Sequence, residues 1–263
     1  MKKIFALIVV TSILLLATAC NNNDEKVFTI GATPVPHVEL LEEIKEAFED
    51  KGYTLKIVEF TDYVTPNLAL ENGEIDANFF QHLPYLDDFN VSNETSLVSA
   101  FGVHVEPLAL YSKKFDNLDA LKDGATISIP ADPVNGARAL LLLQSNGFIT
   151  IDETAGLKAT ENDILENPNN LSFIALEASQ LPRTLDDVDA AIINGNFAID
   201  AGLNPLNDGL LIEGKDSPYV NIVAVKEGDE DLASIKLLKE LLQSSDIKAF
   251  IESKYEGAVV IGY

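Results

Sequence analysis

The fold of this chain is decided by residues 27–80, which read VFTIGATPVPHVELLEEIKEAFEDKGYTLKIVEFTDYVTPNLALENGEIDANFF. Apolar runs bounded by turn residues predict strands at 27–31, 55–60 and 76–80. Apolar residues recur at helical spacing over 37–51, and a second helix is predicted over 63–71. The alternation of strands and helices is typical of an α/β fold.

A second series of strands and helices begins after Tyr111. It predicts strands at 125–130, 172–176 and 189–194 and helices at 137–146 and 178–185. A last strand at 220–226 and helices at 231–243 and 246–255 most economically complete the first series. The sequence therefore predicts two α/β lobes, joined by crossings near 109–112 and 216–221. Lobe 1 is expected at 27–110 and 219–263, and lobe 2 at 111–218.

The N-terminus has the pattern of an export signal. Two lysines precede an apolar run that ends at Ala19, directly before Cys20, which is the single cysteine of the chain. This pattern predicts a lipoprotein signal peptide at 1–19 and a lipidated tether at 20–26, because maturation of bacterial lipoproteins requires a thiol to acylate. The alternative is a secreted protein with one free cysteine, which is a liability outside the cell. We expect anchoring by lipid, such as palmitate, on the extracytoplasmic face of the cell membrane.

The charge of the chain excludes one class of partner. It has 18 Lys and Arg against 42 Asp and Glu, for a net charge of −24, and removal of Lys2 and Lys3 with the signal would make this −26. Nucleic-acid binding requires clustered basic residues, so we expect no nucleic-acid partner. The acidity itself is typical of a solvated surface.

The loops that follow the predicted strands hold the candidate binding residues. In open α/β sheets, ligands bind beyond the carboxyl ends of strands and at the N-termini of helices. Arg138 falls in the first turn of the predicted helix, where a cation is unfavourable unless it has a partner. With Asn135 beside it, this arginine predicts a cleft that binds a small carboxylate. The alternative is that Arg138 pairs with a nearby acid such as Asp132.

Other loop residues are aromatic or amide-bearing. Phe79, Phe80, His82 and Tyr85 form the densest aromatic cluster, and alternation along a strand would place half of it in the core. Asn194 and Asn196 flank Gly195, a pattern that fits a turn or a pair of amide ligands equally well. Asn221 interrupts an apolar run and therefore needs a polar partner.

Motifs of the common enzyme classes are missing. The sequence has no Gly-x-Ser-x-Gly, His-Glu-x-x-His, Cys-x-x-Cys or Gly-x-Gly-x-x-Gly motif. We therefore expect no catalytic activity and no cofactor. The alternative is a metal-binding lipoprotein, because His37, His82 and His104 all fall in the first lobe; our prediction includes no metal site.

Long blocks of the sequence closely resemble the NlpA family of lipoproteins, the methionine-binding components of bacterial ABC importers. The matching blocks lie at 60–67, 78–86, 129–140, 181–183, 193–198 and 217–221. The resemblance implies a two-lobed fold of the periplasmic-binding-protein kind (type II), with the ligand in a cleft between hinged lobes. It also implies a monomer that captures L-methionine or a close analogue and delivers it to an ABC permease.

The resemblance further implies roles for nine side chains. Arg138 would bind the ligand carboxylate, and Asn135, Asn196 and Asn221 would surround its polar end. The thioether would be enclosed by Tyr63, Phe80, His82, Tyr85 and His104, since sulfur packs favourably against aromatic edges. Two residues depart from the family pattern: Ala131 and Val134 stand where Asn and Thr are usual, which puts affinity and the choice among L-methionine, D-methionine and methionine peptides in doubt.

Overall fold

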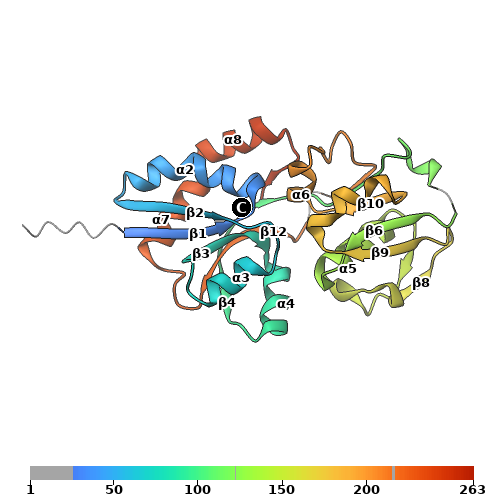
Figure 1. Cartoon of the computed structure of the whole chain (residues 1–263), viewed down its shortest axis with the longest axis horizontal. Helices are drawn as coiled ribbons and strands as arrows, with labels where there is room; N and C mark the ends of the chain where they lie inside the picture. The colour runs from blue at the N-terminus through green and yellow to red at the C-terminus, as the bar shows by residue number, and fades with distance from the viewer. Residues whose placement is uncertain (1–25, 122, 215–216) are drawn as a thin grey trace, which may run out of the picture.

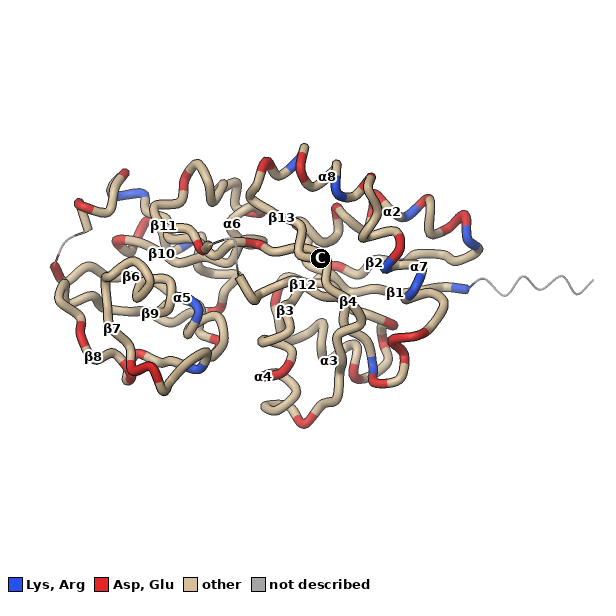
Figure 2. The backbone as a smooth tube through the Cα atoms, turned by 180° about the vertical axis from the view of Figure 1, so that it is seen from behind, with Lys and Arg blue, Asp and Glu red and all other residues tan. Residues whose placement is uncertain are grey.

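The computed structural model describes residues 26–121, 123–214 and 217–263. The predicted signal peptide, Cys20 and the tether up to residue 25 lie outside these ranges. The described residues form two lobes that lie side by side along the long axis of the molecule, each built around its own sheet (Figure 1), and Figure 2 shows the same two lobes from behind. The predicted α/β fold class with two lobes is therefore confirmed.

The sheet of the first lobe has six strands in the order β13-β4-β12-β3-β1-β2. Its strands are β1 (Lys26–Ala32), β2 (Tyr53–Glu59), β3 (Ala77–His82), β4 (Leu97–Val105), β12 (Val220–Lys226) and β13 (Val260–Ile261). The β1 strand runs parallel to β2 and β3, whereas β12 is antiparallel to both of its neighbours, β3 and β4. The strand β12, which follows the second lobe in the sequence, thus lies inside the first sheet, between β3 and β4.

Helices cover both faces of the first sheet. They are η1 (Pro34–Val38), α2 (Glu39–Glu49), α3 (Thr65–Glu71), α4 (Leu83–Asn93), α7 (Ala233–Leu242) and α8 (Ser245–Tyr255). The buried apolar residues of α2 recur at helical spacing, as in Leu40, Ile44 and Phe48, and they share one core with α7 and α8. Leu70 of α3 and Leu86 of α4 pack in a second core on the opposite face.

The sheet of the second lobe has five strands in the order β11-β5-β10-β6-β9. They are β5 (Ala109–Tyr111), β6 (Thr126–Pro130), β9 (Ser172–Leu176), β10 (Ala190–Ile193) and β11 (Leu211–Ile212). Successive side chains of β10 point to opposite faces, so Ile192 packs in the core under α5 (Pro133–Ser145) and Ile193 packs in the core under η5 (Ala178–Asp186) and α6 (Gly195–Asp200).

The remaining elements of the second lobe are short. They are η2 (Leu118–Ala120), β7 (Thr150–Ile151), η3 (Gly156–Lys158), η4 (Glu161–Asp163) and β8 (Ile164–Glu166), of which β7 and β8 form a separate two-stranded sheet. Within the described ranges, no helix is long and apolar enough to cross a membrane.

Several features differ from the sequence prediction, and three of them bear on the cleft. The first crossing precedes β5, because Ala109–Tyr111 pairs with β10 in the second sheet, whereas we placed the crossing at 109–112. The helix α5 begins at Pro133 rather than at residue 137, because Asp132 caps it and proline is well suited to a first helical position. The elements α4 and β4 were not predicted at all.

Candidate ligand-binding site

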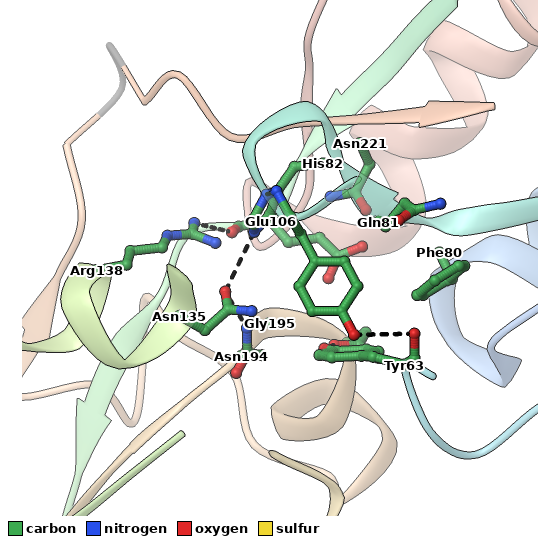
Figure 3. A pocket seen from close by; sticks show the side chains of 12 residues that line it. Tyr63, Phe80, Gln81, His82, Glu106, Asn135, Arg138, Asn194, Gly195 and Asn221 are labelled. Atoms are coloured by element: carbon green, nitrogen blue, oxygen red, sulfur yellow. Dashed lines mark hydrogen bonds between the residues drawn. The ribbon is translucent and has the colours of Figure 1, made fainter. Parts of the chain in front are cut away.

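A narrow cavity lies between the two lobes, where the loops after several strands meet (Figure 3). Its lining side chains are those of Tyr63, Phe80, Gln81, His82, Tyr85, Glu106, Asn135, Arg138, Asn194, Gly195, Asn196 and Asn221. The space in it that is open to a water-sized sphere is about 20 Å³, which is little more than one water molecule needs. A larger ligand therefore needs the side chains or the lobes around the cavity to move.

The sheets explain why these residues meet. Asn221, near the start of β12, pairs with His82 at the end of β3 on one side and with His104 near the end of β4 on the other. The first lobe thus brings polar residues of three adjacent strands, β3, β12 and β4, to one end of its sheet. In the second lobe, α5 directly follows β6 and α6 directly follows β10, and both helices point their N-terminal turns at that end.

Arg138 is the single cation among the lining residues, and it is held on several sides. Its Nε donates to Glu213 Oε1 at 2.9 Å, and its Nη2 donates to Glu213 Oε2 at 2.5 Å and to the carbonyl oxygen of Glu106 at 3.0 Å. Its guanidinium also lies 4.2 Å from the centre of the Tyr219 ring. The side chain is only 5% exposed. These contacts engage Nε and Nη2, and Nη1 takes no part in them.

The acid partner of Arg138 is Glu213 and not Asp132, which was the alternative from sequence. Asp132 instead accepts hydrogen bonds from the backbone N–H of Asn135 at 2.8 Å and from its side-chain amide at 3.0 and 3.1 Å. Arg138 also lies in the second turn of α5, since the helix starts at Pro133. The helix dipole therefore disfavours this cation less than the sequence suggested.

Amide and imidazole groups form a bonded chain beside Arg138. Asn135 Oδ1 accepts from Asn194 Nδ2 at 2.9 Å and lies 3.2 Å from His82 Nε2. His82 Nδ1 accepts from the backbone N–H of Tyr85 at 3.2 Å, so the proton of a neutral ring is on Nε2 and donates to Asn135. Burial and, to a lesser extent, the charge of Arg138 lower the pKa of His82 to about 3. The imidazole is therefore neutral at physiological pH.

The opposite end of the cavity is aromatic (Figure 3). The ring of Tyr63 lies 5.8 Å from those of Phe80 and Tyr85 and 5.0 Å from that of Phe197, between centroids. The Tyr63 hydroxyl donates to Asn196 Oδ1 at 2.5 Å, which links the lobes across the cleft. The cavity thus has one end that suits charged groups and one that suits an apolar or sulfur-containing side chain.

Burial shifts the pKa values of several groups that line the cavity away from those of exposed groups. Burial raises the pKa of Tyr63 and of Tyr85, so both stay protonated and can donate hydrogen bonds. Burial also raises the pKa of the Glu106 carboxyl, while His37 lowers it in part.

The chain matches the sequence model of the family described as NlpA lipoprotein over residues 28–262. This chain belongs to the NlpA lipoprotein family.

Relatives and solved structures of high similarity agree with this assignment. The methionine-binding lipoprotein MetQ of Bacillus subtilis is 42% identical over 270 residues, which cover 99% of this chain and 98% of that protein. The D-methionine-binding lipoprotein MetQ of Salmonella typhimurium is 44% identical over 221 residues, covering 83% of this chain and 82% of that one. A nutrient-binding protein from Burkholderia cenocepacia, solved bound to methionine, superposes with a TM-score of 0.87 at 42% identity, covering 90% of this chain and all of that one.

Of the nine side chains that the NlpA resemblance singled out, eight line the cavity. They are Tyr63, Phe80, His82, Tyr85, Asn135, Arg138, Asn196 and Asn221. The ninth, His104, is fully buried behind the cavity wall, where its Nε2 lies 2.8 Å from Glu106 Oε1. The two departures from the NlpA pattern lie outside the lining: Ala131 is exposed and Val134 is buried away from the cavity.

Four lining residues are not among the ligand contacts predicted from the sequence. Gln81 bonds to Asn67 and Asn78 in a buried amide cluster, so its neighbours explain its polarity. Asn194 and Gly195 were noted only as a turn or ligand pattern. Glu106 was not noted at all, because it follows β4, which we did not predict. An acid directly after an apolar strand and directly before a proline was the available signal.

Proposed function

We propose that this protein is an extracytoplasmic receptor that captures L-methionine, or a close analogue, and delivers it to an ABC permease. The observation that carries the proposal is the cavity itself, which pairs a charged end at Arg138 with an aromatic end at Tyr63, Phe80 and Tyr85. These two ends match the two ends of methionine. The names of the MetQ relatives and the methionine-bound Burkholderia structure support the same ligand.

We propose that the two lobes hinge about the two crossings and close on the ligand. Lobe 1 would comprise 27–110 and 219–263, and lobe 2 would comprise 111–218; the pairing of β5 favours a first boundary a few residues earlier, between Val105 and Ala109. Eight of the nine proposed ligand contacts keep the roles given above, whereas His104 lies behind the cavity wall, where it contacts Glu106. The ligand would be the bridge that favours the closed arrangement.

We propose further that lipid on Cys20 attaches the protein to the outer face of the cytoplasmic membrane, close to its permease. Stable attachment takes two or more acyl chains. The protein would act as a monomer without catalysis, since each ligand is handed on unchanged.

A metal-importer lipoprotein is the second candidate, because His37, His104 and Glu106 place three potential ligand atoms within 4.8 Å of one another. Binding that disappears with a chelator and that is indifferent to Arg138→Ala would favour this candidate.

The test is isothermal titration calorimetry on residues 21–263, which include the whole described fold. The protein is unfolded and refolded to remove carried-over ligand, then titrated with L-methionine, D-methionine, glycyl-methionine and Zn²⁺. Tight one-to-one binding of one methionine form supports the proposal and names the preferred ligand. Heat with Zn²⁺ alone would overturn it in favour of the metal candidate, and silence with all four would reject both.

A further inference from the structure

Tyr219 is a buried aromatic residue next to the cavity, and the proposed ligand contacts give it no role. It lies at the end of the second crossing, directly before β12, and is only 4% exposed. Its backbone N–H donates to Ser217 Oγ at 3.3 Å, and the next residue, Val220, already pairs with Val105 of β4. The tyrosine is therefore attached to the sheet of the first lobe, although it does not line the cavity itself.

The Tyr219 ring contacts one proposed ligand group from each lobe. Arg138, on α5 of the second lobe, has its Cζ 4.2 Å from the centre of the ring, which is within the range of a cation–π contact. The ring of His82, at the end of β3 in the first lobe, lies 4.9 Å away between centroids, at an angle of 60°. A change in this one ring therefore reaches the guanidinium and the imidazole together.

The ion pair with Glu213 does not by itself decide which way Arg138 faces. The two hydrogen bonds fix the guanidinium relative to that carboxylate. However, Arg138, Glu213 and Tyr219 also line a groove of about 260 Å³, whose other lining residues include Leu141 and Ile212. Arg138 thus lies between the cavity and this groove, and the pair could move toward either. Tyr219 supplies a contact on the face of the guanidinium that is independent of Glu213.

We propose that Tyr219 is a positioning residue for the ligand carboxylate, whose ring holds Arg138 toward the cavity. This inference rests on the proposed methionine-receptor function and deepens it. If Arg138 faces the cavity only part of the time, the apparent affinity for a carboxylate falls in proportion. Loss of a cation–π contact is enough to change that population by about 3- to 30-fold. The ring provides this contact, so phenylalanine at the same position should serve as well as tyrosine.

The test compares L-methionine with L-methioninamide, which keeps the side chain and the ammonium but lacks the carboxylate charge. Calorimetry on residues 21–263 gives the ratio of the two Kd values, amide over methionine, which should be about 100 or more in the wild type. Tyr219→Leu should weaken methionine binding about 3- to 30-fold and leave amide binding nearly unchanged, so the ratio falls by that factor. Tyr219→Phe should keep the wild-type ratio.

Tyr255→Leu is the matched control. Tyr255 is likewise buried, at 5% exposure, and has the Nζ of Lys254 5.9 Å from its ring centre, but it ends α8 and does not line the cavity. Its replacement removes a similar amount of buried ring and should leave the ratio unchanged. If Tyr219→Leu fails to fold, Tyr219→Met takes its place, because methionine fills much of the same space without a ring.

A spectroscopic measurement follows Arg138 directly. The chain has two arginines, Arg138 and Arg183, so protein labelled with ¹⁵N-arginine gives two Nε–H signals in NMR spectra, which Arg183→Lys assigns. The Arg138 signal should keep its position in Tyr219→Phe and move in Tyr219→Leu.

The outcomes separate this inference from the receptor function. A Kd ratio that is unchanged in Tyr219→Leu or its substitute, or that falls as far in Tyr219→Phe or Tyr255→Leu, overturns the positioning role and leaves the receptor function intact. An Arg138 signal that does not move in Tyr219→Leu overturns it as well. Wild-type protein that binds neither compound overturns both.

Discussion

The contacts of Arg138 determine which of its N–H groups can bind a ligand. Its Nε and Nη2 are occupied by Glu213 and by the carbonyl of Glu106, and the ring of Tyr219 covers its plane. Arginine can bind an internal acid and a ligand at once because its five N–H groups point in fixed, different directions. Lysine at this position would keep the charge without that geometry.

Arg138→Ala should weaken L-methionine binding by about 2 to 5 kcal/mol, because it leaves the ligand carboxylate unpaired in a buried site. Calorimetry with refolded protein measures this change. Arg183→Ala is the matched control, since Arg183 is an exposed arginine of η5 outside this cavity, and it should bind methionine like the wild type. Unchanged affinity in Arg138→Ala would exclude this arginine as the carboxylate site.

His82 should make the stability of the protein depend on pH. Its folded-state pKa is about 3, below the usual 6.5, so the unfolded state takes up the proton first and stability falls as pH drops from about 6.5 toward 3. One such group contributes about 1.4 kcal/mol per pH unit. Glu106 and Asp132, whose pKa values burial raises, act with the opposite sign.

His82→Gln removes the contribution of His82 while the carboxyls remain in both proteins. Between pH 7 and pH 5, wild type should lose about 2 kcal/mol more stability than the variant. Urea unfolding at the two pH values measures the difference. Equal losses in the two proteins would show that the folded state accepts a proton on His82.

At the scale of elements, the start of α5 connects the stability of a helix to the geometry of the cavity. Asp132 caps α5 and also binds the side chain of Asn135, whose Oδ1 contacts both His82 and Asn194. Asp132→Ala should therefore cost about 0.5 to 2 kcal/mol of stability and also weaken methionine binding.

Ser244→Ala is the matched control for this cap. Ser244 Oγ accepts from the backbone N–H of Ile247 at the start of α8, which contributes no residue to the cavity lining. It should lower stability by a similar amount, measured by urea unfolding, and leave the methionine Kd unchanged. A loss of affinity in Ser244→Ala as large as in Asp132→Ala would mean that the effect of Asp132 is a general loss of stability.

The elements that sequence could and could not predict differ in a physical way. Strands β9 and β12 were predicted with their observed bounds, because apolar runs between turn residues have few alternatives. Helix α4 was missed because its first turn, Leu83-Pro84-Tyr85, was interpreted as a loop, although proline is well tolerated there. Strand β4 contains Gly102 and His104, which obscure its pattern, and with it Glu106 was lost from the predicted site.

Contacts between distant parts of the chain were beyond sequence reasoning. Glu213 is 75 residues from Arg138 and was not recognised as its partner. Likewise, the need of Asn221 for a polar partner was predicted, but the partner is His37, with Nε2 3.2 Å from Asn221 Oδ1 and 184 residues away. Such pairs arise from packing within each lobe and leave no local pattern in the sequence.

At the scale of the whole molecule, Arg138 connects the site to both crossings between the lobes. It bonds to Glu106 at the first crossing and to Glu213 just before the second, and it stacks on Tyr219 at the end of the second. In the part of the chain that the structure describes, side-chain contacts across the cleft include Tyr63 to Asn196, His82 to Asn135 and Lys158 to Asp88. Small polar interfaces of this kind allow the lobes to move.

Methionine should therefore shift the protein from an open to a closed arrangement, because a ligand bound by both lobes favours the state in which they meet. Small-angle X-ray scattering on residues 21–263 should give a smaller radius of gyration with saturating L-methionine than without it. L-alanine, which has the charged groups but no thioether, should produce little change at the same concentration. Arg138→Ala should keep the ligand-free radius at a methionine concentration that closes the wild type. If methionine binds with no change in radius, the cavity fills without hinge closure, and the permease must recognise the loaded receptor by its surface rather than by its shape.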